Sequence, residues 1–359
     1  MHLSKNMKFL KTKSKQVMKK VFIAMAAIAA MACSCSKDEV KSVEVPEQEA
    51  VVSISLRNEV ATRATGSGHG VQADDNTINV LEIFVFNINE GSVDNGFLDG
   101  YKKLTGDELK NLNEIKIRIS AGRKMIYAVA NAQNTDWSEG VTRELFEAQI
   151  ADLYKEDVKD FLMVASKEET IKSTTTVLMT LRRFVSRIQL KSVSVSFAGT
   201  PYEGRPLENV KAYLTNVQTR KRLIDGVGDN LKVVNSKKYV ASDMQGIAME
   251  GMLYDQLASS IAESTHNESH YFYCYENNRK QETETDRFTR LVIEGTLDGI
   301  TYYYPIPIKE LKRNSCYTID VKIHRAGSLD PEVSLEMGTL DLCLEVEGWN
   351  TIPGSVVEF

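Results

Sequence analysis

Short runs of alternating hydrophobic and polar residues recur along most of the chain. The clearest lie at 52–56, 115–119, 317–324 and 340–347. This alternation is typical of strands that bury one face. Residues 78–88 are almost continuously apolar, as expected for a buried strand of a sandwich. Two further apolar runs flank Asp298-Gly299, a dipeptide that predicts a β-hairpin.

The longest strand-like stretch runs from 177 to 197, and its alternation changes phase between Leu190 and Val193. Such a phase change predicts a bulge or a domain junction. Spaced apolar residues predict a helix over 142–161, and a second short helix is expected within 245–264. The fold class that follows is mainly β, with two β-sandwich domains in tandem, split near residue 186, and short inserted helices.

The N-terminus has the pattern of an export signal. Met18-Lys19-Lys20 is followed by twelve apolar residues, 21–32, which is typical of a secretory signal peptide and too short for a membrane-spanning helix. Small residues then precede Cys33 and Cys35, an arrangement that resembles a bacterial lipobox. The sequence Ser-Cys-Ser-Lys-Asp-Glu favours Cys35 as the acylated residue, with Cys33 as the alternative; a plain secretory signal is the remaining interpretation.

A polar tether at 37–50 separates these cysteines from the strand at 52–56. The strand is followed by Ala61-Thr62-Arg63-Ala64-Thr65-Gly66 and a Gly-rich stretch to residue 70. A trypsin-like protease could cut after Arg63 in such a segment. From the residues alone this indication is weak, since any exposed loop arginine would serve.

Composition narrows the possible function classes. The chain has 359 residues, 42% hydrophobic and 26% charged, as expected for about two globular domains. After residue 63 it has 33 basic and 43 acidic residues. That balance repels phosphate backbones, so a nucleic-acid partner is not expected.

No motif for catalysis or cofactor binding is present. The sequence contains no GxSxG, no HExxH, no P-loop and no GxGxxG that opens a helix. His266, His270 and Cys274 would align on a helix, but residues 271–275 predict a strand, so no metal site and no cofactor are expected. The cysteines show no CxxC spacing, and Cys274, Cys316 and Cys343 are expected to be small buried side chains. Tyr302-Tyr303-Tyr304 favours hairpin packing over glycan binding.

The order and spacing of several weak motifs along the chain resemble the Bacteroides-type fimbrillin family, the subunits of type V pili. These motifs are the lipoprotein start at Cys35, the arginine site after a strand, Phe272-Tyr273-Cys274-Tyr275-Glu276-Asn277 ahead of the strand at 291–295, and the stretch from Arg313-Asn314 to Val346-Glu347-Gly348-Trp349.

This resemblance implies two transthyretin-like β-sandwich domains and a maturation mechanism. The precursor would reach the outer membrane as a lipoprotein, and an arginine-specific surface protease would cut between Arg63 and Ala64. The strand carrying Val52, Ile54 and Leu56 would then be lost, and a C-terminal strand of another subunit would fill the groove. The candidate donor residues are Leu340, Leu342, Leu344, Val346, Trp349, Ile352, Val356, Val357 and Phe359.

The resulting expectation is a non-enzymatic stalk subunit of an adhesive fimbrium, assembled on the cell surface with other pilus subunits. Its parts are a signal peptide with lipobox (1–35), a propeptide with the removable strand (36–63), an N-terminal sandwich (64–186) and a C-terminal sandwich (187–359). The alternatives are a tip or anchor subunit of the pilus and a monomeric surface lipoprotein that binds glycan.

Overall fold

A computed structural model describes residues 49–58, 76–133, 140–224, 233–234, 252–333 and 357–358. Within these ranges the fold is mainly β, as the sequence predicts. The helical segments are short: η1 (Gly106–Lys110), α2 (Arg143–Glu147) and η2 (Leu153–Lys155). Among the described residues, no helix combines the length and hydrophobicity that a bilayer crossing requires.

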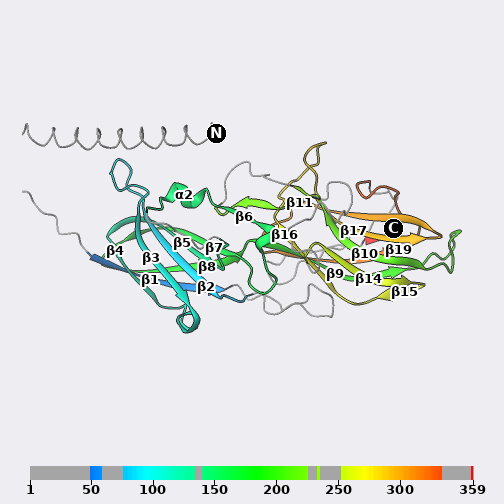
Figure 1. Cartoon of the computed structure of the whole chain (residues 1–359), viewed down its shortest axis with the longest axis horizontal. Helices are drawn as coiled ribbons and strands as arrows, with labels where there is room; N and C mark the ends of the chain where they lie inside the picture. Colours follow the sequence, from blue (N-terminus) through cyan, green and yellow to red (C-terminus); the bar gives the residue numbers. More distant parts are fainter. Residues whose placement is uncertain are drawn as a thin grey trace, which may run out of the picture. The chain divides into compact units, whose positions relative to one another are not determined.

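Residues 49–183 supply a seven-stranded sheet in the order β3-β2-β5-β7-β8-β1-β4 (Figure 1). The strands are β1 (Glu49–Asn58), β2 (Val80–Asn87), β3 (Leu98–Thr105), β4 (Ile115–Ser120), β5 (Gly122–Ala130), β7 (Met163–Ile171) and β8 (Thr174–Arg183). β1 is thus first in sequence but lies between two later strands.

The sheets that follow begin at β9 (Val185–Val195), directly after β8. One sheet has the order β14-β10-β17-β18, and the other the order β13-β11-β16-β9-β19-β20, with β15 also paired to β9. Their strands are β10 (Leu207–Thr215), β11 (Val217–Gln218), β13 (Val233–Val234), β14 (Tyr254–Ile261), β15 (Ser264–His266), β16 (His270–Tyr275), β17 (Thr289–Leu297), β18 (Ile300–Ile308), β19 (Cys316–Ile323) and β20 (Val357–Glu358). A separate two-stranded sheet pairs β6 (Ile150–Asp152) with β12 (Arg220–Arg222).

Strand β2 explains the nearly continuous apolar run at 78–88. Leu81, Ile83 and Val85 belong to one hydrophobic core, whereas Phe84 and Phe86 belong to the other. Because successive side chains of a strand point to opposite faces, a strand between two cores is apolar at most positions, and Glu82 is the buried exception within β2.

Two local predictions are confirmed in detail. The phase change after Leu190 is a bulge, since Ile319 pairs with Leu190 and the next residue, Asp320, pairs with Ser192. Asp298 and Gly299 connect β17 to β18 with φ of 48° and 80°, the left-handed backbone of a two-residue hairpin turn.

The helix predicted over 142–161 is wrong for most of its length. Of this range, only Arg143–Glu147 is α-helical, and Ile150–Asp152 instead pairs as a strand with Arg220–Arg222. The short helix predicted within 245–264 is not found in the described part, 252–264, which contains β14 paired with β10; residues 245–251 lie outside the described residues. In both described segments, pairing with a distant strand outweighed a local helical spacing.

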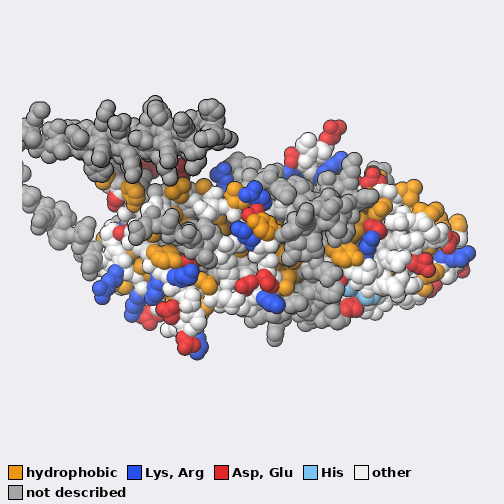
Figure 2. All heavy atoms as spheres, in the orientation of Figure 1, with side chains coloured by type: hydrophobic (Ala, Val, Ile, Leu, Met, Phe, Trp, Pro, Cys, Tyr) orange, Lys and Arg blue, Asp and Glu red, His pale blue; other side chains and the backbone are white. Residues whose placement is uncertain are grey.

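Side chains on the described surface carry both charge signs. On the face shown in Figure 2, Lys and Arg side chains lie beside Asp and Glu side chains and among apolar ones. Arg123 and Glu168 form one such pair, with 2.5 Å between Nη2 and Oε1. Both side chains are about half exposed, so this pair adds little to stability.

A buried carboxyl links the loop after η2 to β16. Glu156 Oε1 accepts hydrogen bonds from Tyr275 Oη at 2.9 Å and Gln133 Nε2 at 3.0 Å, and Glu156 Oε2 accepts one from Leu162 N at 3.0 Å. Burial raises the pKa of the Glu156 carboxyl to about 7, although these donors partly oppose the shift.

This raised pKa predicts that the free energy of unfolding decreases as pH rises. Between about pH 4.5 and 7 the folded chain holds the Glu156 proton more tightly than the unfolded chain does, so rising pH favours unfolding. The free energy of unfolding of the native chain, relative to Glu156→Gln, should fall by about 3 kcal/mol from pH 4.5 to 8. Denaturant titrations across this range measure it, with Asp157→Asn as an exposed control. Parallel pH profiles for the native chain and Glu156→Gln would contradict the prediction.

Candidate functional site: the first strand and its slot

Strand β1 is an internal strand of the first sheet, between β8 and β4. On one edge it pairs antiparallel with β4, from Glu49↔Ser120 to Ile54↔Ile115. On its other edge it pairs parallel with β8, from Val51↔Thr174 to Asn58↔Leu181. The predicted strand at 52–56 is therefore confirmed and is longer than its alternation indicated.

One face of β1 lies at the centre of a hydrophobic core. Ala50, Val52 and Ile54 are 0% exposed and Leu56 is 5% exposed. They share this core with apolar residues of β2, β4, β5 and β8, namely Leu81, Ile83, Val85, Ile115, Ile117, Ile119, Ile126, Ala128, Val177, Met179 and Leu181. Burial of each large aliphatic side chain contributes about 1.5–3 kcal/mol, so β1 is an integral part of this core.

Strand β8 depends on β1 for most of its ladder. Over the described residues, β7 and β8 pair only at Met163↔Arg183 and Val164↔Arg182, whereas β1 and β8 share eight pairs. β8 also supplies three buried side chains to the core, Val177, Met179 and Leu181. If β1 left, these positions of β8 would lose both their ladder partner and their apolar cover.

Strand β4, by contrast, has contacts that do not involve β1. Asp99 on β3 accepts hydrogen bonds from Ser120 N at 2.9 Å and from Ser120 Oγ at 3.1 Å. The buried Lys124 ammonium lies 2.7 Å from the Asp99 carboxylate and donates to Ser120 Oγ at 2.7 Å. This polar cluster would hold β4 beside β3. The space that β1 occupies between β4 and β8, here called the slot, would therefore keep one of its walls.

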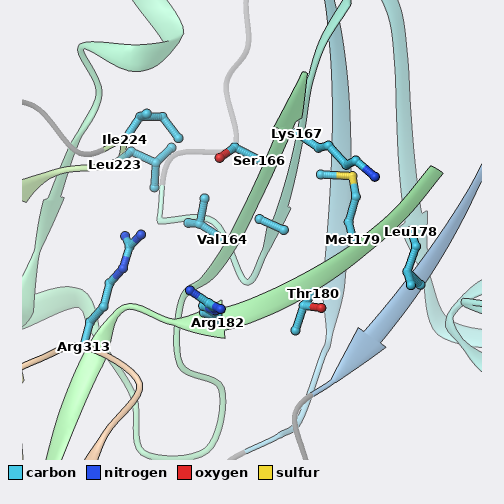
Figure 3. Close-up of a pocket in the computed structure, with 11 residues that line it drawn as sticks. Val164, Ser166, Lys167, Leu178, Met179, Thr180, Arg182, Leu223, Ile224 and Arg313 are labelled. Carbon is cyan, nitrogen blue, oxygen red and sulfur yellow. The ribbon is translucent and has the colours of Figure 1, made fainter. Parts of the chain in front are cut away.

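Where β7 and β8 diverge, a cavity of about 430 Å³ opens between them (Figure 3). Its basic lining residues are Lys167, Arg182 and Arg313. Leu178, which is 43% exposed, also lines it. Leu178, Thr180 and Arg182 lie on the face of β8 away from the core that holds β1, whereas Met179, which also lines the cavity, belongs to that core. Its cations could accommodate an acidic group.

Most of the other predicted site residues lie outside the described residues. These are Cys33, Cys35, Arg63, Ala64, Leu340, Leu342, Leu344, Val346, Trp349, Ile352, Val356 and Phe359. Of the donor candidates only Val357 is described; it lies in β20, which pairs parallel with β19 at Val321↔Val357 and Lys322↔Glu358.

The tyrosine run at 302–304 belongs to the packing of the β17–β18 hairpin. Tyr304 is fully buried and donates to Arg325 O at 3.0 Å, and Tyr302 is 9% exposed. Two of the three rings are therefore not available for stacking on a sugar, as the sequence analysis expected. Cys274 and Cys316 have buried side chains, which also matches expectation.

Residues 50–199, which include β1 and its slot, match the model of the family described as major fimbrial subunit protein (FimA). Over these residues the chain resembles the FimA family. The resemblance to fimbrillins that the sequence predicts is thereby confirmed. No curated protein sequence matches the chain.

Solved structures of fimbrial and cell adhesion proteins show the same fold. A fimbrilin (fimA) from Porphyromonas gingivalis W83 is 17% identical, with a TM-score of 0.55 over 86% of this chain and 97% of that one. A candidate cell adhesion protein from Bacteroides eggerthii is 18% identical, with a TM-score of 0.55 over 88% and 98%. A third, from Parabacteroides distasonis, is 19% identical, with a TM-score of 0.53 over 85% and 97%. At these identities the likeness establishes the fold.

Proposed function

We propose that the chain is a structural stalk subunit of an adhesive pilus, without enzymatic activity, that assembles by strand exchange. The precursor is held at the outer membrane by acyl chains on Cys35, or on Cys33 as the alternative. An arginine-specific surface protease then cuts between Arg63 and Ala64. The segment that carries β1 leaves, and a C-terminal strand of another subunit takes its place.

The observation that carries this proposal is the position of β1. It precedes the proposed cut, yet its Val52, Ile54 and Leu56 side chains fill the core and its backbone is the main ladder partner of β8. A sheet that loses an internal strand presents unpaired N–H and C=O groups and apolar pockets. Another strand can pair with these backbone groups and fill these pockets, since strand addition supplies main-chain hydrogen bonds and alternate side chains.

The C-terminal residues are the proposed donor. Apolar residues recur at every second position of 340–346, as they do in the strand at 52–56. The described part of this region, β20, is held to β19 by two residue pairs. Insertion of one subunit's C-terminal strand into the next subunit's slot is a head-to-tail contact, which produces a filament rather than a closed dimer.

A disulfide between β1 and β4 tests whether β1 must leave. Ser53 pairs with Lys116, and both side chains lie on the face away from the core. Cα atoms of paired antiparallel residues are about 4.5–5.5 Å apart, which suits a disulfide. We expect oxidised Ser53→Cys/Lys116→Cys protein to be cut after Arg63 but to stay monomeric in gel filtration, and reduction to restore polymers.

The matched control is Arg123→Cys/Thr170→Cys, an exposed pair between β5 and β7 that does not involve β1. It should polymerise whether oxidised or reduced. N-terminal sequencing of the native polymer should start at Ala64. Polymerisation of the oxidised β1–β4 variant, at the rate of its reduced form, would refute strand exchange at this slot.

A further inference from the structure

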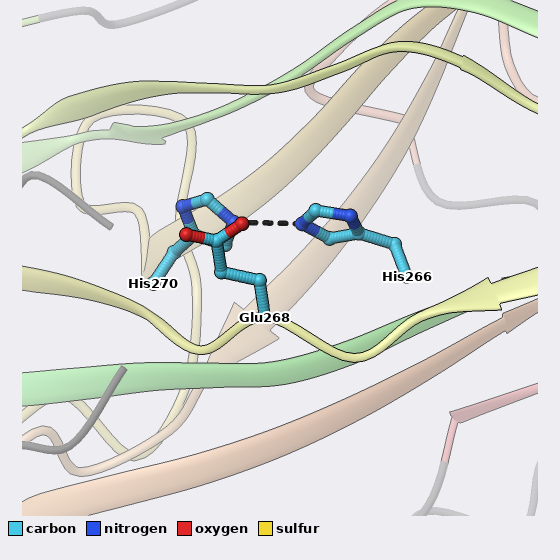
Figure 4. Close-up of side chains that lie close together, drawn as sticks. All are labelled: His266, Glu268 and His270. Carbon is cyan, nitrogen blue, oxygen red and sulfur yellow. Dashed lines mark hydrogen bonds between the residues drawn. The ribbon is translucent and has the colours of Figure 1, made fainter. Parts of the chain in front are cut away.

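Two histidines from successive strand segments meet in the C-terminal sheets. β15 ends at His266 and β16 begins at His270, and both segments pair with β9, at Val193 and Leu190. In a continuous strand residues four apart would be about 13 Å apart. Here the chain between β15 and β16 bends, and the two Nε2 atoms lie 2.9 Å apart (Figure 4).

The environment of His270 fixes which of its nitrogens is available. His270 Nδ1 lies 2.6 Å from Asp255 Oδ2, and both residues are 2% exposed. A carboxylate only accepts hydrogen bonds, so we assign the proton of the neutral ring to Nδ1. Nε2 then presents its lone pair toward His266. This carboxylate–histidine arrangement is the one that orients histidine ligands in metal sites.

Glu268, in the bend between the two histidines, completes the cluster. Its carboxylate lies beside the His270 ring in Figure 4. One ligand atom from each of His266, Glu268 and His270 lies within 4.8 Å of the others. His270 is buried, whereas His266 and Glu268 are partly exposed, so solvent can reach one side of the cluster.

We propose that His266, Glu268 and His270 bind a divalent transition-metal ion of the zinc class, with Asp255 as the positioning residue for His270. Two imidazole nitrogens and one carboxylate oxygen suit zinc and leave a fourth position for water. The carboxylates of Glu268 and Asp255 balance the two positive charges of the ion. This site is independent of strand exchange.

The site would join the two sheets that follow β8. Asp255 belongs to β14 in the four-stranded sheet, whereas His266 and His270 belong to segments paired with β9 in the other sheet. A metal that fixes the His270 ring also fixes its hydrogen bond to Asp255. Bound zinc would therefore stabilise the folded chain.

The test is zinc titration of the chelator-treated full chain by calorimetry, together with thermal unfolding. We expect a site of one zinc per chain and a rise in Tm of about 5 °C at a zinc concentration about 100 times the Kd. His266→Asn and Glu268→Gln, both at partly exposed positions, should each weaken binding at least about tenfold. Asp255→Asn should weaken it without removing a ligand.

His324→Asn is the matched control, because this exposed histidine lies outside the cluster and its Nδ1 faces Ser196 O at 3.3 Å. It should leave the zinc affinity unchanged. Co²⁺ absorption in the visible range should report a four-coordinate site in the native chain and disappear in His266→Asn. Zinc binding of equal affinity in His266→Asn would assign the ion to other groups and overturn the proposal, as would the absence of binding by the folded chain.

Discussion

Ile54→Asp should destabilise the uncleaved chain by about 5 kcal/mol or more, one of the two largest effects expected here. Ile54 is 0% exposed, and its neighbours in the core are aliphatic side chains of β4 and β8. The substitution removes apolar contacts and places a carboxylate where no polar partner is available. Urea unfolding of the precursor measures the change.

Ser53→Asp is the control for this experiment. Ser53 is on the same strand but on its other face, opposite the exposed Lys116. An aspartate there can pair with Lys116, so the expected change is within about 1 kcal/mol. If both substitutions destabilised the precursor equally, β1 would not have the core role that its burial indicates.

Ile54→Asp should affect the precursor but not the mature protein. Once the chain is cut after Arg63 and β1 has left, Ile54 is no longer part of the subunit. Polymers that form from the cleaved Ile54→Asp chain should then be as resistant to heat as native polymers. A destabilised polymer would mean that β1 stays in the assembled subunit.

Deletion of residues 340–359 should abolish self-assembly of the cleaved chain. The deletion removes every candidate donor residue, from Leu340 to Phe359, but leaves β1, β4 and β8 and therefore the slot. The truncated chain could accept a strand but not donate one. Gel filtration should show monomers, with at least about a hundredfold loss of polymer, because the strand carries the main-chain hydrogen bonds of the contact.

Mixing the truncated chain with cleaved native chains tests whether it still accepts a donor strand. Added to cleaved native chains, it should join one end of each polymer and reduce the mean polymer length. The control is a chain with only residues 347–359 deleted, which tests whether the run at 340–346 donates on its own. Polymers of normal length from the chain lacking 340–359 would place the donor elsewhere.

The sequence by itself was sufficient to predict which face of a strand is buried wherever apolar and polar residues alternate. The faces of β1 and β4 follow from alternation, because side-chain direction in a strand is a local property, and the nearly continuous apolar run of β2 correctly indicated a buried strand. The turn at Asp298-Gly299 and the bulge after Leu190 are equally local. Assignment to the fimbrillins came from the order of motifs along the chain.

The choice of partners was decided only by the tertiary structure. No local signal places β1 between β8 and β4, or pairs Ile150–Asp152 with Arg220–Arg222 in place of a helix. The same holds for His266 and His270, whose spacing gave no metal site on a strand until the bend between β15 and β16 brought their rings together. Pairing between distant strands depends on contacts that alternation does not encode, so the sequence determined which faces are apolar, and the fold determined which of those faces meet.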